Sequence, residues 1–578
     1  MFGDTRKKER KSFVHRYFAH LHSLRASDAL VLKIALLASG IFLMLFLIDV
    51  SKEYSVSVAT SGGSYTEGIV GTPRFINPVL AVTRADKDVT ALVYDGLMKI
   101  DPQGNLVPNI AESVTVSEDG LTYNIILKQG VQFHDGVALT ARDILFTISR
   151  IQDPVLASPL RANFDGIVVE VLGDYELNFV LPSPYAPFIE NLTFGILPEH
   201  IWKDAGTEEF PFSQHNSEPI GTGPYVVQQI VRNSSSIPEE YVLSAFEHYH
   251  KGRPKIDTIV LRFYATEEKL LNAFTEGLID GVAGVHPNNT VSFGSPEKTH
   301  HLERIPLPRV ITLFLNQNKN PALRDLSART ALDAVIDRDE LIRQTLRGYG
   351  NTTSTPIPKG FGIETQPTAP PITTDDARAI LRDGGWEFSS DEQVWKKDID
   401  GVSTPLTVTI STVNTQDFES TGEFLRTIWG ELGVPVTVKQ FEQTDLTQAI
   451  IRPRDFETLL FGTQLGRSLD YYAFWHSSRK NDPGLNVAQY ANITTDALLV
   501  DLRKEQDTEK RRSAIQAFVE ELKKEVPAIF LYTPELLYVF PNKIHNAYFT
   551  GISEPHERFM NISDWYIETD SIWKQFAS

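Results

Sequence analysis

Two strand–helix–strand patterns, about 150 residues apart, restrict the fold of this chain more than any other feature of its sequence. The first has a β-rich run at residues 256–264, a helix that Thr266 can cap, and a return strand after Gly277. The second runs from a strand at 406–410 through an amphipathic helix that Gly433 ends. Because each unit builds one strand pair covered by a helix, two distant units predict two separate α/β bodies.

A β-rich region is expected ahead of the first unit. Asp119-Gly120 and Asp135-Gly136 each lie between runs that alternate apolar and polar residues. Asp-Gly pairs in that setting are typical of hairpin turns, because glycine readily adopts the positive φ that such turns require. The chain is therefore expected to hold two α/β bodies and a β-rich insert.

The N-terminal region has a long apolar run at residues 29–50, whose only interior charges are Lys33 near its start and Asp49 near its end. At 1.5 Å per residue this run spans roughly 30 Å, the thickness of a bilayer core. Eight basic and four acidic residues occupy positions 1–50, and most of the basic ones precede the run. The positive-inside rule then places residues 1–28 in the cytoplasm and the main body outside.

A cleaved signal peptide is the alternative interpretation of this run. Its length and the lack of a small-residue cleavage site directly after it favour an uncleaved transmembrane anchor. Residues 51–65 are polar and rich in Ser and Gly, which suits a linker between the anchor and the main body.

Charge and cysteine content exclude several classes of function. The chain has 55 Lys and Arg against 74 Asp and Glu, a net charge of −19, whereas a nucleic-acid binder needs a basic surface. It contains no Cys, which excludes disulfides, thiolate nucleophiles, Cys-ligated metals and a lipid-bearing cysteine. We therefore expect no nucleic-acid partner.

Catalytic and metal-binding patterns are weak. Ser477 and Lys480 have the spacing of a serine–lysine dyad, but such a four-residue pattern is common by chance, and a polar surface loop is the better explanation. The histidine pairs at 248 and 250 and at 300 and 301 lack a further ligand at useful spacing. We expect no catalytic residue, no metal and no cofactor, and therefore no enzyme.

An ordered series of short motifs carries a resemblance to a known family. The motifs are PRFINP at 73–78, LVYDGL at 92–97, VSEDGLTY at 116–123, VQFHDGVALTAR at 131–142, GTGPY at 221–225, HYHKGRPKID at 248–257, EGLID at 276–280, IDRDEL at 336–341 and AILRDGGW at 379–386. In this order, over about residues 66–572, the chain resembles the family-5 extracellular solute-binding proteins. These are the oligopeptide, dipeptide and nickel-type receptors of ABC importers.

The resemblance implies an α/β, bilobed class C periplasmic-binding-protein fold with an extra β-rich domain, here preceded by one transmembrane helix. The implied domains are lobe I at 66–92, 213–305 and 535–572, an inserted domain II at 93–212, and lobe III at 306–534. Many relatives are lipoproteins held by an acylated Cys. This chain has none, so the segment at 29–50 is left as its anchor.

The resemblance also implies a ligand site between the lobes. Val82, Thr83 and Arg84 match the segment that presents backbone to a peptide ligand. The opposing strand contains Gly462, Thr463 and Gln464, with Thr463 in place of the usual Trp. The acid that fixes a peptide's free ammonium falls near Gly466, and Asp470 would replace it only if the loop is reshaped.

The functional expectation is a membrane-anchored receptor that captures a peptide or peptide-like solute by lobe closure. The receptor would then deliver that solute to the permease subunits of an ABC importer. Two alternatives remain at this stage: a surface sensor or protein-interaction module on the same fold, and an exported hydrolase.

Overall fold

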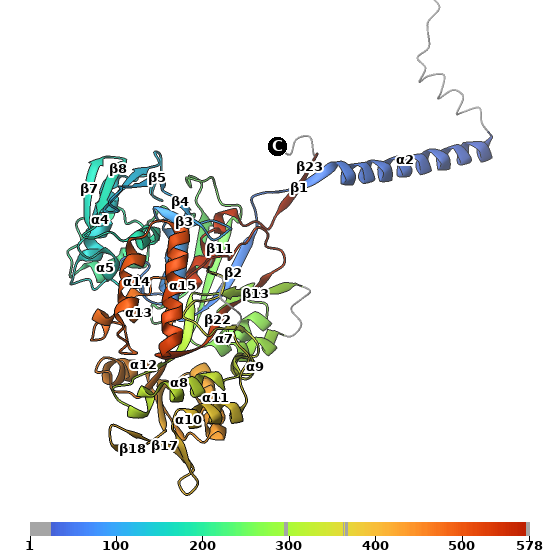
Figure 1. Cartoon of the computed structure of the whole chain (residues 1–578). Helices are drawn as coiled ribbons and strands as arrows, with labels where there is room; N and C mark the ends of the chain where they lie inside the picture. Colours follow the sequence, from blue (N-terminus) through green and yellow to red (C-terminus); the bar gives the residue numbers. More distant parts are fainter. Residues whose placement is uncertain (1–24, 294–298, 362, 364–367, 574–578) are drawn as a thin grey trace, which may run out of the picture. The chain divides into compact units, whose positions relative to one another are not determined.

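The computed structural model describes residues 25–293, 299–361, 363 and 368–573 (Figure 1). The chain divides into two compact units, residues 1–60 with 568–578 and residues 61–567. Most of the basic segment predicted at 1–28 lies outside the described residues.

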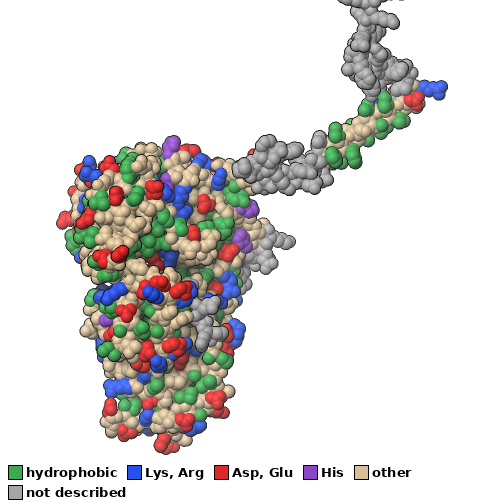
Figure 2. Space-filling view, turned by 45° about the horizontal axis from the view of Figure 1, so that its top comes forward, with side chains coloured by type: hydrophobic (Ala, Val, Ile, Leu, Met, Phe, Trp, Pro, Cys, Tyr) green, Lys and Arg blue, Asp and Glu red, His purple; other side chains and the backbone are tan. Residues whose placement is uncertain are grey.

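The first unit contains the helix α2 (Ala26–Tyr54) and two paired strands, β1 (Ser55–Ala59) and β23 (Thr569–Trp573). The strands are antiparallel, with Ser55 opposite Trp573. Large apolar side chains along α2 are exposed, among them Leu37 at 66% and Phe42 at 73% (Figure 2).

Two predictions fall on this unit. Across the part of the chain that the structure describes, we find no helix whose length and apolar character suffice for a membrane crossing. The anchor at 29–50 therefore stays a prediction from the sequence. The expected linker at 51–65 contains the end of α2, all of β1 and the start of β2, because the alternating Ser and Val of β1 suit a strand better than a tether.

The second unit is built on one large sheet (Figure 1). Its strands, in spatial order, are β20 (Val436–Phe441), β19 (Val408–Val413), β21 (Thr458–Gln464), β14 (Arg309–Leu315), β22 (Ala528–Pro541), β12 (Gly281–Ala283), β2 (Ser64–Val70), β11 (Thr258–Tyr264), β10 (Pro238–Ala245) and β9 (Tyr225–Arg232). Two further strands, β13 (His300–Pro306) and β15 (Gly350–Thr352), also pair with β22.

The long strand β22 joins two hydrophobic cores. Its first half pairs with β14, placing Ile529 opposite Leu313 in one core. Its second half pairs with β12 and β13, placing Leu536 opposite Ile305 in the other core. We call the two parts the β14 lobe and the β2 lobe. The expected bilobed α/β fold is confirmed.

Both predicted strand–helix–strand units are confirmed. In the β2 lobe, Thr266 Oγ1 accepts a hydrogen bond of 3.3 Å from Lys269 N and caps α7 (Glu267–Thr275), which links β11 to β12. Both strands are parallel to β2. In the β14 lobe, α11 (Gln416–Leu432) ends at Gly433 with a φ of +92° and leads from β19 to the parallel β20.

The expected β-rich region forms a four-stranded antiparallel sheet within the β2 lobe. Its order is β5 (Ala111–Val116), β6 (Thr122–Leu127), β8 (Glu176–Val180) and β7 (Val168–Gly173). Both predicted Asp-Gly turns are present, since Gly120 N donates to Ser117 O and Gly136 N donates to Phe133 O, each at 2.9 Å. The side chains of this sheet join the core of the β2 lobe.

The remaining elements cover these sheets or connect them. The helices are α3 (Arg84–Val93), α4 (Ala141–Gln152), α5 (Arg161–Phe164), α6 (Glu199–Trp202), α8 (Leu326–Ala334), α9 (Arg338–Leu346), α10 (Thr374–Asp383), α12 (Gln443–Asp445), α13 (Tyr472–Trp475), α14 (Ile493–Lys504) and α15 (Thr508–Glu525). Short 3₁₀ or π segments are η1 (Ala186–Thr193), η2 (Phe210–Phe212), η3 (Gln214–Asn216), η4 (Pro287–Phe293), η6 (Pro321–Arg324), η7 (Leu446–Ile451), η8 (Ser477–Arg479), η9 (Pro555–Phe559) and η10 (Ile562–Asp564). Small sheets are formed by β3 (Met98–Ile100) with β4 (Leu106–Pro108), and by β16 (Glu387–Ser389), β17 (Val394–Ile399) and β18 (Val402–Pro405).

Candidate ligand-binding site

A cavity of about 410 Å³ is lined by residues of both lobes. Most of its lining belongs to the β2 lobe, including α3, the loop before β3, η1 and the segment around η9, while Gly466 and Arg467 come from the β14 lobe. Its acidic, basic and histidine lining residues are Lys87, Asp95, Lys99, Glu190, Arg467, Glu554, His556 and Glu557. The volume and the mixed polar lining are those of a small-molecule site.

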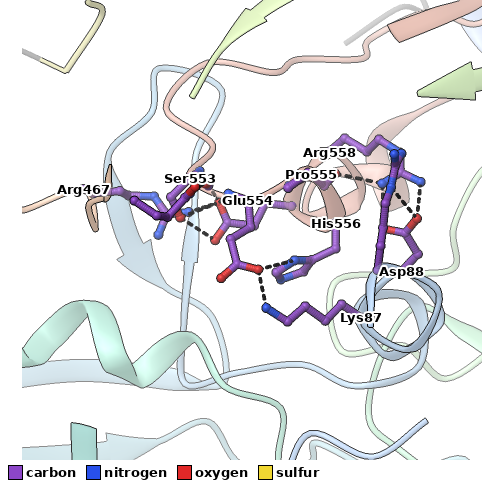
Figure 3. Close-up of polar contacts among 11 residues, drawn as sticks. Lys87, Asp88, Arg467, Ser553, Glu554, Pro555, His556 and Arg558 are labelled. Atoms are coloured by element: carbon purple, nitrogen blue, oxygen red, sulfur yellow. Dashed lines mark hydrogen bonds and ion pairs between the residues drawn. The ribbon is translucent and has the colours of Figure 1, made fainter. Parts of the chain in front are cut away.

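Glu554 lines the cavity, and both Lys87 and His556 point toward it (Figure 3). Lys87 Nζ donates to Glu554 Oε2 at 2.5 Å, and His556 Nδ1 lies 3.4 Å from the same oxygen. Burial by itself raises the pKa of Glu554, but the ion-pair contact with His556 and the charge of Lys87 outweigh it and lower the pKa to about 2. The Glu554 carboxylate is therefore ionised, and Lys87 and His556 already compensate its charge.

Arg467 connects the two lobes at the edge of the cavity. Its Nε donates to Gly551 O at 2.9 Å, and its guanidinium forms an ion pair with Glu557. Glu557 also accepts hydrogen bonds of 2.5 Å from Ser553 N and 3.0 Å from Ser553 Oγ. Since a charge-assisted network of this kind is directional, it fixes the loop after β21 against the segment before η9.

A buried ionic cluster lies next to Lys87 and His556 (Figure 3). Arg558 donates to both carboxylate oxygens of Asp88, at 2.7 and 2.8 Å, and to Glu67 Oε1 at 2.6 and 2.9 Å. Burial raises the pKa of Asp88, but the Arg558 charge outweighs it and the net effect is a lowered pKa. The cluster joins β2, α3 and η9, so it sets the positions of Lys87 and His556.

The first predicted site segment lies beside this cavity, and none of its three residues lines it. Val82 is 65% exposed. Thr83 caps α3, because its Oγ1 accepts a hydrogen bond of 3.1 Å from Asp86 N. Arg84 turns toward the buried cluster, with its Nε 3.6 Å from Asp88 Oδ2. The cavity is lined instead by the neighbours Ala81 and Lys87.

The second predicted segment also lies outside the lining. Gly462 and Thr463 pair with β14, and Thr463 Oγ1 donates to Val310 O at 3.3 Å. Gln464 reaches across to the β2 lobe, where its Nε2 donates to Ser553 O at 2.6 Å. These residues therefore support the junction between the lobes, while Gly466 and Arg467, a few residues later, line the cavity.

Asp470 is engaged elsewhere. Its carboxylate accepts a hydrogen bond of 2.7 Å from Arg503 Nη2 on α14 and one of 3.2 Å from Tyr185 Oη. It is not among the residues that line the cavity. The structure thus pairs this carboxylate with Arg503 and Tyr185.

Sequence reasoning did not identify Glu190, Glu554, His556 or Glu557. No spacing pattern connects them, because they come from segments more than 350 residues apart in the chain. Gly466 was identified, but only as the position of a missing acid. A Cβ atom built there would lie 3.1 Å from Glu190 Oε2, so a carboxylate from η1 fills the adjoining space.

The weaker catalytic and metal patterns have other contacts in the structure. The Ser477 hydroxyl donates to Asp496, and His250 Nε2 lies 3.0 Å from Asp95 Oδ2. His301 Nδ1 lies 2.8 Å from Asn542 Oδ1. Within residues 25–573, apart from the short undescribed gaps, no group of three or more His, Asp or Glu side chains is placed to hold a metal ion.

Comparison with known proteins gives consistent matches. A profile described as bacterial extracellular solute-binding proteins, family 5 middle, matches residues 105–484, which is more than half of the chain. The oligopeptide-binding protein AppA of Bacillus subtilis is 25% identical over 527 residues, covering 89% of this chain and 94% of that protein. The dipeptide-binding protein of Escherichia coli is 24% identical over 469 residues, covering 76% of this chain and 84% of that protein.

Solved structures agree with this fold. The structure of Bacillus subtilis AppA in complex with a nonapeptide has a TM-score of 0.68 at 24% identity, covering 88% of this chain and 100% of that one. The substrate-binding protein CtaP of Listeria monocytogenes has a TM-score of 0.73 at 25% identity, with the same coverage. From the profile match and the shared fold we conclude that this chain belongs to the bacterial extracellular solute-binding proteins of family 5.

Proposed function

We propose that this protein is the membrane-anchored receptor of an ABC importer and that its ligand is a peptide or a peptide-like solute. The observation that carries the proposal is the cavity, to which both lobes contribute, in a chain whose relatives include oligopeptide- and dipeptide-binding proteins. The receptor would bind its solute reversibly and perform no covalent chemistry.

The proposed mechanism is hinge closure of the β14 lobe on the β2 lobe. Few connections cross between the lobes: β22 is shared, and residues 307–308 lie between β13 and β14. Hinges of this kind absorb φ/ψ changes in a few residues while each core moves as a rigid body. The contacts of Arg467 and Gln464 with residues 551–557 would then form on closure and open on release.

The domain division follows from the same proposal. Lobe I at 66–92, 213–305 and 535–572 corresponds to the β2 side of the sheet. The insert at 93–212 contains the four-stranded sheet, and lobe III at 306–534 corresponds to the β14 lobe. In this arrangement the cavity is lined mainly by lobe I and the insert, with lobe III closing over it.

The membrane anchor is proposed on the sequence. The apolar run at 29–50 follows a basic leader, and the chain has no Cys that could carry a lipid. Expression of the full chain and of a variant without residues 1–50 tests this. We expect the full chain in the membrane fraction, resistant to carbonate extraction, and the shortened chain in the soluble fraction. Equal distribution of the two would refute the anchor.

Ligand capture is tested by thermal unfolding of the full chain in detergent with a panel of solutes. The panel contains peptides of two to nine residues, opines and nickel–histidine. Because a ligand that binds only the folded state stabilises it by mass action, a 100-fold excess over Kd adds about 2.7 kcal/mol. We expect peptides to raise the unfolding temperature. If no solute in the panel does so, the receptor function is wrong.

A further inference from the structure

The carboxylate of Glu190 occupies a distinctive place in the cavity. Glu190 belongs to η1 in the β2 lobe, and its side chain faces Gly466 of the β14 lobe. A Cβ atom at position 466 would lie 3.1 Å from Glu190 Oε2. Since glycine has no side chain, the Glu190 carboxylate stands where a side chain from the opposite lobe would otherwise enter the cavity.

The nearby guanidinium groups are bonded to other partners. Arg467 forms an ion pair with Glu557 and donates to Gly551 O. Arg511, on α15, donates to Ser468 O at 2.8 Å and to the carbonyl of Leu502. Within the described residues, neither guanidinium makes an ion pair or a hydrogen bond with Glu190.

The electrostatic environment leaves the Glu190 carboxylate incompletely compensated. Burial raises its pKa to about 7, and the charges of Arg467 and Arg511 and a hydrogen bond from Ser468 offset that burial only in part. The charge of Glu557, on η9, acts in the opposite direction and raises the pKa of Glu190 further, while the Tyr185 hydroxyl is hydrogen-bonded to Asp470. A desolvated carboxylate in this state is stabilised by any cation that enters the cavity and donates hydrogen bonds to it.

We propose that Glu190 binds a positively charged group of the ligand, an ammonium or a guanidinium, at the junction with Gly466. The inference rests on the proposed solute-binding function and specifies which end of the solute the cavity recognises. The anionic partner comes from the β2 lobe, so a ligand can be oriented before the β14 lobe closes.

The test uses two probes, both pools of tripeptides of random sequence. The first pool has free amino termini. The second is N-acetylated and made without Lys, Arg and His, so that it contains no cationic group. Affinities of the full chain in detergent are measured by titration calorimetry at pH 8 and pH 6.

The wild-type chain is expected to bind the first pool at least tenfold more tightly than the second. Its affinity for the first pool should fall several-fold from pH 8 to pH 6, because Glu190 is then largely protonated. Glu190→Gln should lose at least tenfold affinity for the first pool, keep its affinity for the second, and lose the pH dependence. Glu509→Gln, which removes an exposed carboxylate on α15, should behave as wild type.

A second variant distinguishes loss of the carboxylate charge from a failure of the protein to fold. Glu190→Gln combined with Gly466→Asp moves the carboxylate to the opposite wall and should recover most of the lost affinity. Unfolding curves of each variant show that it is folded. If the wild type binds neither pool, the proposed peptide function fails and this inference fails with it. If the wild type binds both pools equally, or if Glu190→Gln binds as wild type, only the inference about Glu190 is overturned.

Discussion

Arg558 and Asp88 are joined by two hydrogen bonds of 2.7 and 2.8 Å, although 470 residues separate them in the chain. Both side chains are completely buried, and Glu67 completes the cluster. The pair holds η9 against α3, and Lys87 and His556 on these two elements both contact Glu554 in the cavity wall. A structural ion pair therefore determines the geometry of the candidate site.

Removal of this guanidinium should destabilise the protein strongly. In Arg558→Met the Glu67 carboxylate loses its guanidinium partner and Asp88 keeps only Arg84, 3.6 Å away, and breaking such a buried pair costs about 3–5 kcal/mol. The urea midpoint of unfolding should fall accordingly. Arg512→Met is the control, because Arg512 pairs with Glu509 on the surface and should cost at most about 1 kcal/mol. Equal midpoints for the two variants would contradict the role assigned to the cluster.

Gly223 should not tolerate a side chain. A Cβ atom there would lie 2.5 Å from Val93 C and 2.7 Å from Leu92 O, and backbone atoms cannot move aside cheaply. Gly223→Ala should therefore lose about 1–3 kcal/mol of stability. Gly173→Ala is the matched control, since no atom lies within 4 Å of its Cβ position, and its urea midpoint should hardly change. A tolerated Gly223→Ala would show that the close approach to Val93 is not needed.

His134 should make stability depend on pH below neutrality. Burial lowers the pKa of His134 to about 4, and the neutral ring contacts Gly223 O at 3.0 Å and accepts from Gly221 N at 3.3 Å. The unfolded chain takes up the proton near pH 6.5 and the folded chain does not, so stability falls as pH drops from about 6.5 to about 4.

The measurement compares unfolding temperatures of wild type and His134→Gln between pH 7 and pH 4.5. Wild type should lose about 2 kcal/mol more than the variant over this range. His301→Gln, at a partly exposed site, should follow wild type. Parallel curves for wild type and His134→Gln would be inconsistent with a buried neutral imidazole.

Glu190 should act on stability in the opposite pH direction. Its folded pKa of about 7 exceeds the ordinary 4.5, so the folded state binds the proton more tightly than the unfolded state does. Wild-type stability is therefore lost as pH rises from about 4.5 to about 7 and is level above that. Glu190→Gln removes this loss and should be more stable than wild type by about 2–3 kcal/mol at pH 8, with no difference at pH 4.

Denaturant titrations of the two proteins at pH 4, 6 and 8 measure this difference, with Glu509→Gln as a control that should match wild type at every pH. A Glu190→Gln variant less stable than wild type at pH 8 would mean that Arg467 and Arg511 compensate the carboxylate fully.

Local features were predictable because they depend on residues close together in the chain. Thr266 caps its helix, Gly433 ends another at positive φ, and the Asp119-Gly120 pair lies in a hairpin turn. Gly221 and Gly223 were recognisable as a motif, but neither has a positive φ. Glycine is required at both positions because the backbone of Val93 lies too close for a Cβ atom. This contact joins segments about 130 residues apart, so no local pattern encodes it.

The sequence by itself determined the α/β class, the two strand–helix–strand units, the family resemblance and the absence of an acid at position 466. Only the tertiary structure decided which charges meet in the cavity. It placed Lys87 and Arg467 in the lining of the cavity, paired Asp470 with Arg503, and brought Glu190 beside Gly466. The physical reason is that hydrogen bonding and hydrophobic periodicity act over a few residues, whereas compensation of a buried charge depends on whichever distant segments the fold packs against it.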